Sequence, residues 1–351
     1  MTRIAVIPGD GIGIEVTREA VLAVREAAAV AGTPIEFEEF PYGADHFLRT
    51  GETLPQAGFE RLQGFDAILL GALGDPRVPD NRHAADILLG LRFRLDLYVN
   101  HRPVRLLDER LCPLKGRGAR DIDFVIFREN TEGLYAGVGG FFKKGSADEI
   151  AVQQDINTRK GVERIIRHAF AWARANKRTR VLMSDKSNAL TYGHDLWQRV
   201  HKEVAAEYPD IEASHMYVDA LAMQLVKDPS PYQVIVACNM FGDILSDLGA
   251  QLQGGLGLAA SANLHPGRIG LYEPVHGSAP RHAGKNIANP IGAILSAAMM
   301  LENLGRADEA RLIEGAVADC VRAGRTTRDV GGPLGTAEAG AAIREVIRAG
   351  R

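Results

Sequence analysis

The stretch Ile4-Ala-Val-Ile7, followed by Gly9-Asp-Gly-Ile-Gly13, decides the fold class of this 351-residue chain. Four consecutive apolar residues predict a buried strand, and closely spaced glycines predict a tight turn after it. The next segment predicts a helix that ends at Gly32, because its apolar residues recur at helical spacing. Further strands are expected at Ile35–Phe40 and Phe65–Gly71. Strand, helix and strand at this spacing predict an α/β fold with parallel strands and crossover helices.

The rest of the chain contains more short apolar segments. Three of them predict buried strands: Phe124–Phe127, Val181–Met183 and Val234–Ala237. The last two are followed by polar residues, and polar strand ends are where open α/β sheets place their chemistry. Between Val162 and Ala173, apolar residues trace one face of a helix. The chain is too long for one ordinary hydrophobic core and therefore predicts two domains.

Composition argues against several classes of function. Apolar residues make up 46% of the chain and charged residues 24%, which is typical of globular proteins. The net charge of −3 gives no electrostatic reason to expect a nucleic-acid partner. No apolar stretch reaches the roughly 18 residues that a membrane span needs. The cysteines, Cys112, Cys238 and Cys320, stand in no metal or redox spacing, so we expect reduced thiols in a cytoplasmic protein.

The segment Asn239-Met-Phe-Gly-Asp-Ile-Leu-Ser-Asp247 carries the main chemical signal. If it begins a helix, Asp243 and Asp247 stand at positions i and i+4 on one face. Two carboxylates so placed repel each other unless a cation lies between them. Oxygen ligands of this kind suit Mg²⁺ or Mn²⁺. The alternative is a helix start whose acids interact favourably with the helix dipole.

Other polar residues could belong to the same site. Asp219 ends the predicted strand His215–Val218, although taken alone it favours an N-cap of a helix over Ala220–Leu225. Tyr135 and Lys186 are a potential acid and base, with solvation or packing as the alternative role for each. Three arginines would clamp an anionic substrate if they converged, or form separate surface ion pairs if they did not. They are Arg92, Arg102 and Arg128.

Two glycine-containing regions bear on nucleotide binding. Gly9–Gly13 follows a strand but lacks the G-x-G-x-x-G spacing, so we do not predict a Rossmann fingerprint. In Glu273–Pro280 and Gly284–Pro290, small residues would let the backbone approach a ligand, and exposed N–H groups could receive phosphate.

Five motifs occur in the order found in one known family. They are Gly9–Gly13, Arg128-Glu-Asn-Thr-Glu-Gly133 with Tyr135, Asp185-Lys-Ser-Asn188, Asn239–Asp247 and Glu273-Pro-Val-His-Gly-Ser-Ala-Pro280. The set resembles the β-decarboxylating dehydrogenases that act on isopropylmalate, isocitrate, homoisocitrate or tartrate and D-malate. The resemblance implies a two-domain α/β fold with a mixed central sheet, distinct from a Rossmann fold. It also implies a first domain of residues 1–98 plus 254–351 and a second domain of residues 99–253.

The resemblance further implies the role of each site residue. Asp243 and Asp247, with Asp219 from a second subunit, resemble the ligands of Mg²⁺ or Mn²⁺. Tyr135 resembles the catalytic acid, and Lys186 from the second subunit resembles the base, so the active sites of a homodimer are shared. Substrate contacts are expected from Arg92, Arg102, Arg128, Leu88, Leu89 and Asn188. Cofactor contacts are expected from Ile12, Glu273, His276, Gly277, Ser278, Ala279, Arg281 and Asn289.

Substrate choice in the resembled family depends on residues one and two helical turns before the first arginine. Here Leu88 and Leu89 form an apolar wall, which suits 3-isopropylmalate or a small malate and leaves the third carboxylate of isocitrate unpaired. Ala85 stands where isopropylmalate dehydrogenases usually have Glu, and several other stretches are more similar to tartrate/D-malate dehydrogenases. The sequence favours 3-isopropylmalate, with tartrate or D-malate next and isocitrate or homoisocitrate after them. A non-catalytic regulatory subunit is the alternative outside enzymes.

The identity of the nicotinamide cofactor stays open. NAD-using relatives typically carry Asp after the His-Gly-Ser-Ala-Pro motif, whereas this chain has Arg281-His282. An arginine there could pair with the 2′-phosphate of NADP, or it could face solvent while NAD is used.

Overall fold

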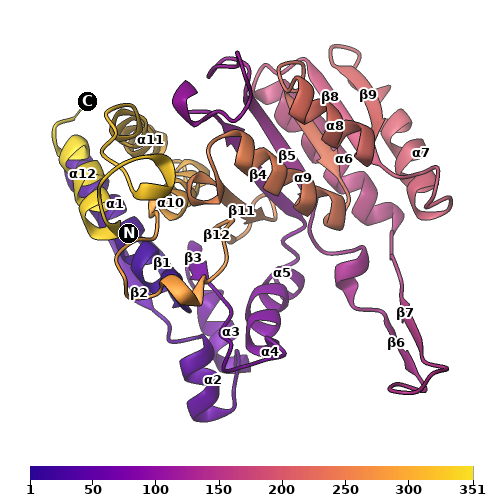
Figure 1. The fold of residues 1–351 in the computed structure, drawn as a ribbon, viewed down its shortest axis with the longest axis horizontal. Helices are drawn as coiled ribbons and strands as arrows, with labels where there is room; N and C mark the ends of the chain where they lie inside the picture. The colour runs from indigo at the N-terminus through magenta and orange to yellow at the C-terminus, as the bar shows by residue number, and fades with distance from the viewer. Residues whose placement is uncertain (351) are drawn as a thin grey trace.

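The computed structural model describes residues 1–350, and a large mixed β-sheet runs through the molecule (Figure 1). In spatial order its strands are β2 (Ile35–Glu39), β1 (Thr2–Gly9), β3 (Ala67–Ala72), β12 (Gly270–Pro274), β11 (Ala260–Leu264), β4 (Val99–Arg105), β5 (Asp123–Glu129), β10 (Val234–Ala237), β8 (Arg180–Asp185) and β9 (Glu212–Tyr217).

Strand direction changes in the middle of this sheet. Strands β2, β1, β3 and β12 pair in parallel, and so do β5, β10, β8 and β9. Between these two groups, β11 pairs antiparallel with both β12 and β4, and β4 pairs antiparallel with β5. The parallel arrangement predicted for the N-terminal third is confirmed. The mixed sheet is also confirmed, and its strand order is not that of a Rossmann fold.

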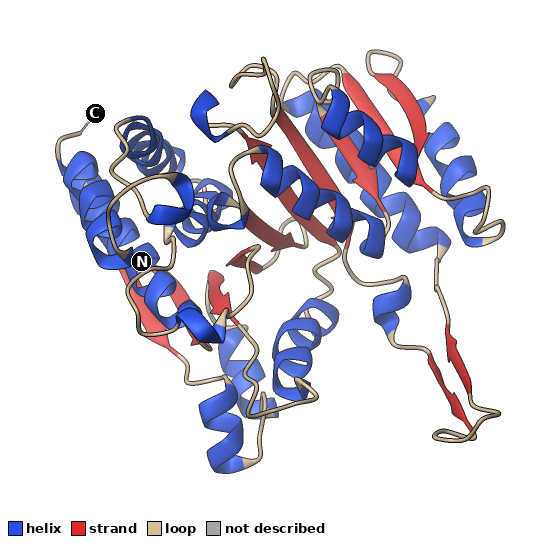
Figure 2. Ribbon diagram, viewed as in Figure 1, coloured by secondary structure: helices blue, strands red, loops and turns tan. Residues whose placement is uncertain are grey.

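Helices flank the sheet on both faces (Figure 2). They are α1 (Ile12–Ala31), α2 (Ala44–Thr50), α3 (Gln56–Leu62), α4 (Arg82–Ala84), α5 (Gly90–Arg94), α6 (Arg159–Ala175), α7 (Gly193–Ala205), α8 (Val218–Lys227), α9 (Asn239–Leu252), α10 (Ile291–Asn303), α11 (Ala307–Arg322) and α12 (Thr336–Arg348). Among residues 1–350, no helix combines the length and apolar character needed to cross a lipid bilayer.

The apolar cores follow from the alternation of side chains along the strands. In β1, Ile4 and Val6 pack beneath α1, α10, α11 and α12, while Ala5 and Ile7 pack on the opposite face. A separate core, built from residues between Val99 and Leu252, holds β4, β5, β8 and β10 against α6, α7 and α9. Strands buried on both faces read as continuous apolar runs, which is why they were visible in the sequence.

The predicted helix face and helix end agree with the structure. The apolar face predicted between Val162 and Ala173 lies within α6 and is fully buried. Gly32 ends α1 in the left-handed conformation, with φ of 68°, as a C-cap glycine should. One local prediction was wrong, because α8 begins at Val218 and its N-cap is Tyr217. Asp219 therefore lies inside the first turn and is not the N-cap.

A two-stranded arm projects from the body of the protein (Figure 1). It consists of β6 (Gly139–Phe142) paired antiparallel with β7 (Ile150–Gln153). Four large apolar side chains on the arm are more than half exposed, namely Phe141, Phe142, Ile150 and Val152. The sequence pattern did not predict these two strands, because the arm has no core of its own to impose a buried periodicity.

Candidate active site

A helical segment from Arg82 to Arg94 supplies one wall of the candidate site. Its centre, Ala85–Leu89, is a π-helical turn between α4 and α5. Such turns insert an extra residue into a helix and often occur at functional sites. Here the turn holds Leu88 and Leu89 on the same cavity as the buried Arg92 side chain.

The three arginines converge, which their separation in sequence could not reveal. Arg92 comes from α5, Arg102 from β4 and Arg128 from β5, and all three line one cavity of about 320 Å³. Each is more than 90% buried. Desolvation makes three adjacent buried cations costly unless carboxylates compensate them. Glu273 and Asp243 line the same cavity and offset part of this positive charge, and the remaining charge favours an anionic ligand.

Arg102 lies between the two aspartates of α9. Its Nη1 is 3.2 Å from Asp243 Oδ1 and 3.7 Å from Asp247 Oδ1, and it donates a hydrogen bond to Ser246 Oγ at 2.6 Å. The prediction that α9 would place both acids on one face is confirmed, and the Arg102 guanidinium is a cation that lies between them.

Arg128 is held from two sides. Its Nε donates to Asn239 Oδ1 at 2.9 Å, and its Nη1 forms an ion pair with Asp243. Burial lowers the pKa of Arg128 to about 9, and the neighbouring charges of Arg102 and Arg92 act in the same direction, while Asp243 opposes them. A ligand carboxylate in the cavity, in addition to that of Asp243, would offset the combined positive charge of Arg92, Arg102 and Arg128.

Tyr135 faces the same cluster from the loop that follows β5. Its hydroxyl donates to Asp243 Oδ2 at 2.9 Å, and the Arg128 guanidinium lies 5.0 Å from its ring centre. Burial raises the pKa of Tyr135, and the charge of Asp243 raises it further. The hydroxyl therefore keeps its proton at neutral pH and is available as a donor.

The two acids of α9 differ in their surroundings. Burial by itself would raise the pKa of Asp243, but Arg128, Arg102 and the Tyr135 hydroxyl outweigh it and lower the pKa. Burial raises the pKa of Asp247, and the charge of Asp243 adds to this effect against Arg102. Both groups supply the oxygen donors that Mg²⁺ and Mn²⁺ prefer. Within residues 1–350, no third acid, histidine or cysteine completes a metal-binding group with them.

Lys186 and Asp219 form a separate pair outside this cavity. Lys186 Nζ is 2.6 Å from Asp219 Oδ1, and this contact lowers the pKa of Asp219. Asn188 follows Lys186 on an exposed loop. One chain thus brings together the arginines, Tyr135, Asp243 and the leucines, but not Lys186, Asn188 or Asp219.

The glycine-rich C-terminal segments border a second, larger cleft of about 1110 Å³. Three of the residues predicted to contact the cofactor line it, namely Ile12, His276 and Asn289. The N–H of Ile12 donates to the Ser278 carbonyl at 2.8 Å, which joins the start of α1 to the His-Gly-Ser-Ala-Pro motif. Ala279 holds a left-handed conformation with φ of 37°, and Arg281 is exposed on the short turn after it.

Glu273 and Gly277 line the arginine cavity rather than this cleft. Glu273 Oε1 accepts from Arg92 Nη2 and from Asn263 Nδ2, both at 2.9 Å. The carboxylate thereby fixes the first arginine of the cluster, a contact that the sequence did not predict. The two cavities share His276 in their linings.

Comparison with known proteins agrees with this geometry. Residues 3–343 match the family described as isocitrate/isopropylmalate dehydrogenase. The chain belongs to this family. The resemblance drawn from the five motifs is thereby confirmed over nearly the whole sequence.

Individual members of the family are similar over most of their length. The 3-isopropylmalate dehydrogenase of Thermobifida fusca is 49% identical over 319 residues, which is 90% of either chain. That of Clavibacter sepedonicus is 47% identical over 352 residues, covering 98% of this chain and 97% of the other. The crystal structure of isocitrate dehydrogenase from Methylococcus capsulatus superposes with a TM-score of 0.91 at 39% identity, covering 99% of this chain and all of that one.

Two positioning residues of this dehydrogenase site escaped sequence reasoning. Asn239 holds Arg128, and Ser246 holds Arg102. Both lie in the Asn239–Asp247 motif, where only the acids drew attention. Their spacing on α9 could have signalled them, since Asn239, Asp243 and Ser246 share one helix face. The sequence also did not single out further residues that line the larger cleft, namely Asn286, Arg328, Asp329 and Glu338.

Proposed function

We propose that this dehydrogenase oxidises and decarboxylates 3-isopropylmalate, using a nicotinamide dinucleotide and Mg²⁺ or Mn²⁺. One observation carries the proposal: three buried arginines, a tyrosine, an aspartate and two leucines line a single cavity. This lining matches a small dicarboxylate that also bears an apolar group. The names of the relatives from Thermobifida fusca and Clavibacter sepedonicus support the same substrate.

The apolar wall favours 3-isopropylmalate over isocitrate. Leu88 and Leu89 offer no donor to a third carboxylate, and an unpaired charge there would lose its hydration without compensation. Ala85, which also lines the cavity, leaves room for a branched alkyl group. Tartrate or D-malate is the second candidate, because the same arginines would bind its two carboxylates while the leucines contacted no substituent.

Different side chains would carry out the separate steps of the reaction. The arginine cluster orients the two carboxylates, and it excludes water by its burial. Lys186 of a second copy would accept the hydroxyl proton as hydride leaves for the nicotinamide. Tyr135, which holds its proton, would deliver it to carbon after CO₂ departs. Asp243 and Asp247, with Asp219 of the second copy, would hold a divalent cation, whose role is to stabilise negative charge on oxygen.

Residues of two chains are needed for this assignment, so we propose a homodimer with shared active sites. Lys186 and Asp219 already form a pair on one chain, at a distance from the arginine cavity of that chain. The exposed apolar side chains of the β6–β7 arm are suited to a subunit contact. We also propose two domains, residues 1–98 with 254–351 and residues 99–253, in keeping with the separate core between Val99 and Leu252.

The cofactor proposal covers both NAD and NADP. Exposed Arg281 follows the His-Gly-Ser-Ala-Pro motif and is adjacent to His282, which lines the larger cleft. A guanidinium there could meet a 2′-phosphate or remain in solvent. We place the enzyme in the cytoplasm, in keeping with its free cysteines Cys112, Cys238 and Cys320.

A spectrophotometric panel tests the function. The purified protein is offered 3-isopropylmalate, D-malate, tartrate, isocitrate and homoisocitrate with each nicotinamide and Mn²⁺, and reduced cofactor is followed by absorbance. We expect the highest kcat/KM with 3-isopropylmalate. A higher kcat/KM with another of these acids would identify that acid as the substrate instead. Absence of turnover with all of them would indicate a non-catalytic regulatory subunit.

A further inference from the structure

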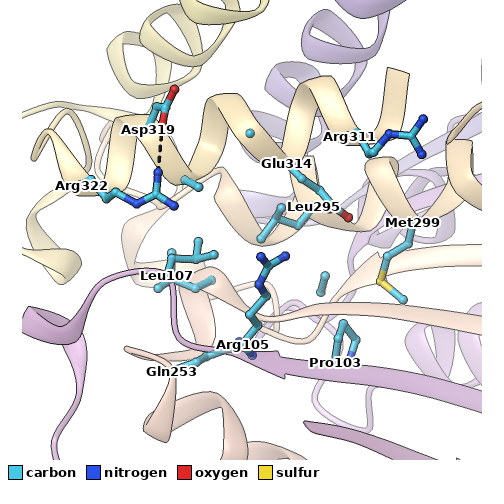
Figure 3. Close-up of a pocket in the computed structure, with 14 residues that line it drawn as sticks. Pro103, Arg105, Leu107, Gln253, Leu295, Met299, Arg311, Glu314, Asp319 and Arg322 are labelled. Carbon is cyan, nitrogen blue, oxygen red and sulfur yellow. Dashed lines mark hydrogen bonds and ion pairs between the residues drawn. The ribbon is translucent and has the colours of Figure 1, made fainter. Parts of the chain in front are cut away.

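A third cavity lies on the other face of β4 from the arginine cluster. Side chains alternate along a strand, so Arg102 and Val104 point toward α9, whereas Pro103 and Arg105 line this cavity. Helices α10 and α11 form its opposite side (Figure 3). Its volume of about 430 Å³ falls within the range of about 300–1,000 Å³ typical of small-molecule sites.

Most of the lining is apolar. The side chains of Leu107, Leu258, Leu295 and Met299 surround the cavity, together with Ala260 and Ala318. Leu258 and Met299 are buried, and the other two leucines are partly buried. Apolar side chains around a cavity favour an occupant with a hydrocarbon portion, because contact with it removes further apolar surface from water.

Two opposite charges face the cavity without partners. Figure 3 shows the Arg105 side chain rising from β4 toward α10 and α11, and Glu314 extending from α11. Among residues 1–350, neither the Arg105 guanidinium nor the Glu314 carboxylate forms an ion pair or a side-chain hydrogen bond. The other two arginines of the lining are already engaged, Arg322 with Asp319 at 3.0 Å and Arg311 with Asp308.

The environment of Glu314 calls for a cation. Burial raises the pKa of Glu314, and the charge of Glu302 raises it further, while Arg105 and Arg311 act in the opposite direction. An ammonium group beside this carboxylate would compensate for its desolvation. Gln253 also lines the cavity, and its Oε1 accepts from the Arg105 backbone N–H at 2.8 Å.

We propose that this cavity binds a small zwitterion with an apolar chain, of the α-amino-acid class. Its carboxylate pairs with Arg105, its ammonium group pairs with Glu314, and its side chain lies among Leu107, Leu295 and Met299. A simple alkyl carboxylate would leave Glu314 uncompensated, and a simple alkylamine would leave Arg105 uncompensated. The site is distinct from the arginine cavity, and it does not depend on the identity of the substrate.

Isothermal titration of the purified full-length protein tests the proposal with three probes that share one alkyl chain. L-Norleucine carries both charges, hexanoate lacks the ammonium group and pentylamine lacks the carboxylate. We expect saturable binding of norleucine, with hexanoate and pentylamine weaker by about tenfold or more, since each loses one charged contact. Absence of saturable norleucine binding up to about 10 mM, or equal affinity for hexanoate, would overturn the proposal.

Variants locate the site. Glu314→Gln keeps the size of the side chain and removes its charge, and Arg105→Gln replaces the guanidinium with a shorter neutral amide. Each should weaken norleucine binding by about tenfold. Arg311→Gln is the matched control, because Arg311 borders the same cavity but already pairs with Asp308, and its affinity should stay within about twofold of the wild type. Unfolding temperatures without ligand verify that each variant is folded. Undiminished binding in both Arg105→Gln and Glu314→Gln would refute the assignment, whatever substrate the enzyme oxidises.

Discussion

The arginine–aspartate cluster and the Lys186–Asp219 pair contrast sharply, although both are expected to serve one reaction. In the cluster, Arg102 and Arg128 are almost fully buried, and their charges are compensated by Asp243. The Lys186–Asp219 pair is partly open to solvent, with the Asp219 side chain 66% exposed. The cluster is therefore part of the folded core of one chain, whereas the pair contributes little to it. Substitutions in either region should therefore reduce catalysis, but only those in the cluster should also reduce the stability of the fold.

The largest expected effect is on turnover, and it should be equal in the two regions. Lys186→Ala removes the proposed base, and Asp243→Asn removes a proposed metal ligand. Each should lower kcat by roughly 10³-fold or more with 3-isopropylmalate. Steady-state kinetics measure this, with Lys160→Ala on the exposed face of α6 as a control that keeps wild-type turnover. Near-normal kcat in Lys186→Ala or Asp243→Asn would disprove the role of that residue.

Chelation should abolish activity without unfolding the chain. The acids proposed to hold the cation belong to both regions, so its removal disables the site while each local ion pair persists. After EDTA treatment we expect turnover to fall to background and to return on addition of Mn²⁺ or Mg²⁺. Circular dichroism before and after treatment checks the fold. Full turnover after exhaustive chelation would contradict the metal assignment.

Stability should distinguish the two regions. Asp243→Asn leaves Arg128 and Arg102 buried with less compensation, which we expect to cost about 3 kcal/mol of unfolding free energy. Lys186→Ala breaks a partly exposed pair and should leave the unfolding midpoint close to that of the wild type. Urea unfolding of both variants provides the measurement. Equal midpoints for the two variants would show that the two regions contribute equally to stability.

The apolar wall should produce a smaller, selective effect. Leu88→Asn replaces a hydrocarbon contact with a polar one on the cavity that contains the arginines. We expect kcat/KM to fall by roughly tenfold for 3-isopropylmalate and to change much less for D-malate, which has no alkyl substituent. The ratio of the two constants is the readout. A parallel fall for both substrates would place Leu88 outside substrate selection.

The last expected effect is a pH dependence of stability that lies outside both regions. Burial lowers the pKa of His201 to about 4, so the folded protein keeps this histidine neutral. Below about pH 6.5 the unfolded chain binds a proton that the folded chain does not, so stability falls as pH falls toward 4. Each such histidine contributes a slope of about 1.4 kcal/mol per pH unit.

His201→Leu removes the proton that the unfolded chain would bind at this position, so it should reduce the dependence of unfolding free energy on pH by the contribution of one histidine. Unfolding free energies at pH 5 and pH 7 measure the change, and Lys160→Ala again serves as a control. An unchanged difference between the two pH values in His201→Leu would show that other groups set the acid sensitivity.

The sequence predicted the placement of site residues that are close together in the chain, but not of those that are far apart. The i, i+4 placement of Asp243 and Asp247 was readable because a helix imposes a fixed geometry on nearby residues. The grouping of Arg92, Arg102 and Arg128 was not, because it depends on β4 and β5 pairing beside α5 in the folded sheet. Asn239 and Ser246 could be placed on the helix face of Asp243, but their partners Arg128 and Arg102 are distant in the chain and could not be predicted.

The sequence by itself determined the α/β class, the buried strands and helix faces, and the family, because these depend on local periodicity and on motifs of neighbouring residues. Only the tertiary structure decided that β4 would send Arg102 into one cavity and Arg105 into another, and that a π-helical turn would present Leu88 and Leu89. Long-range strand pairing and helix packing set those positions. They arise from contacts between residues tens to hundreds of positions apart, which no local pattern encodes.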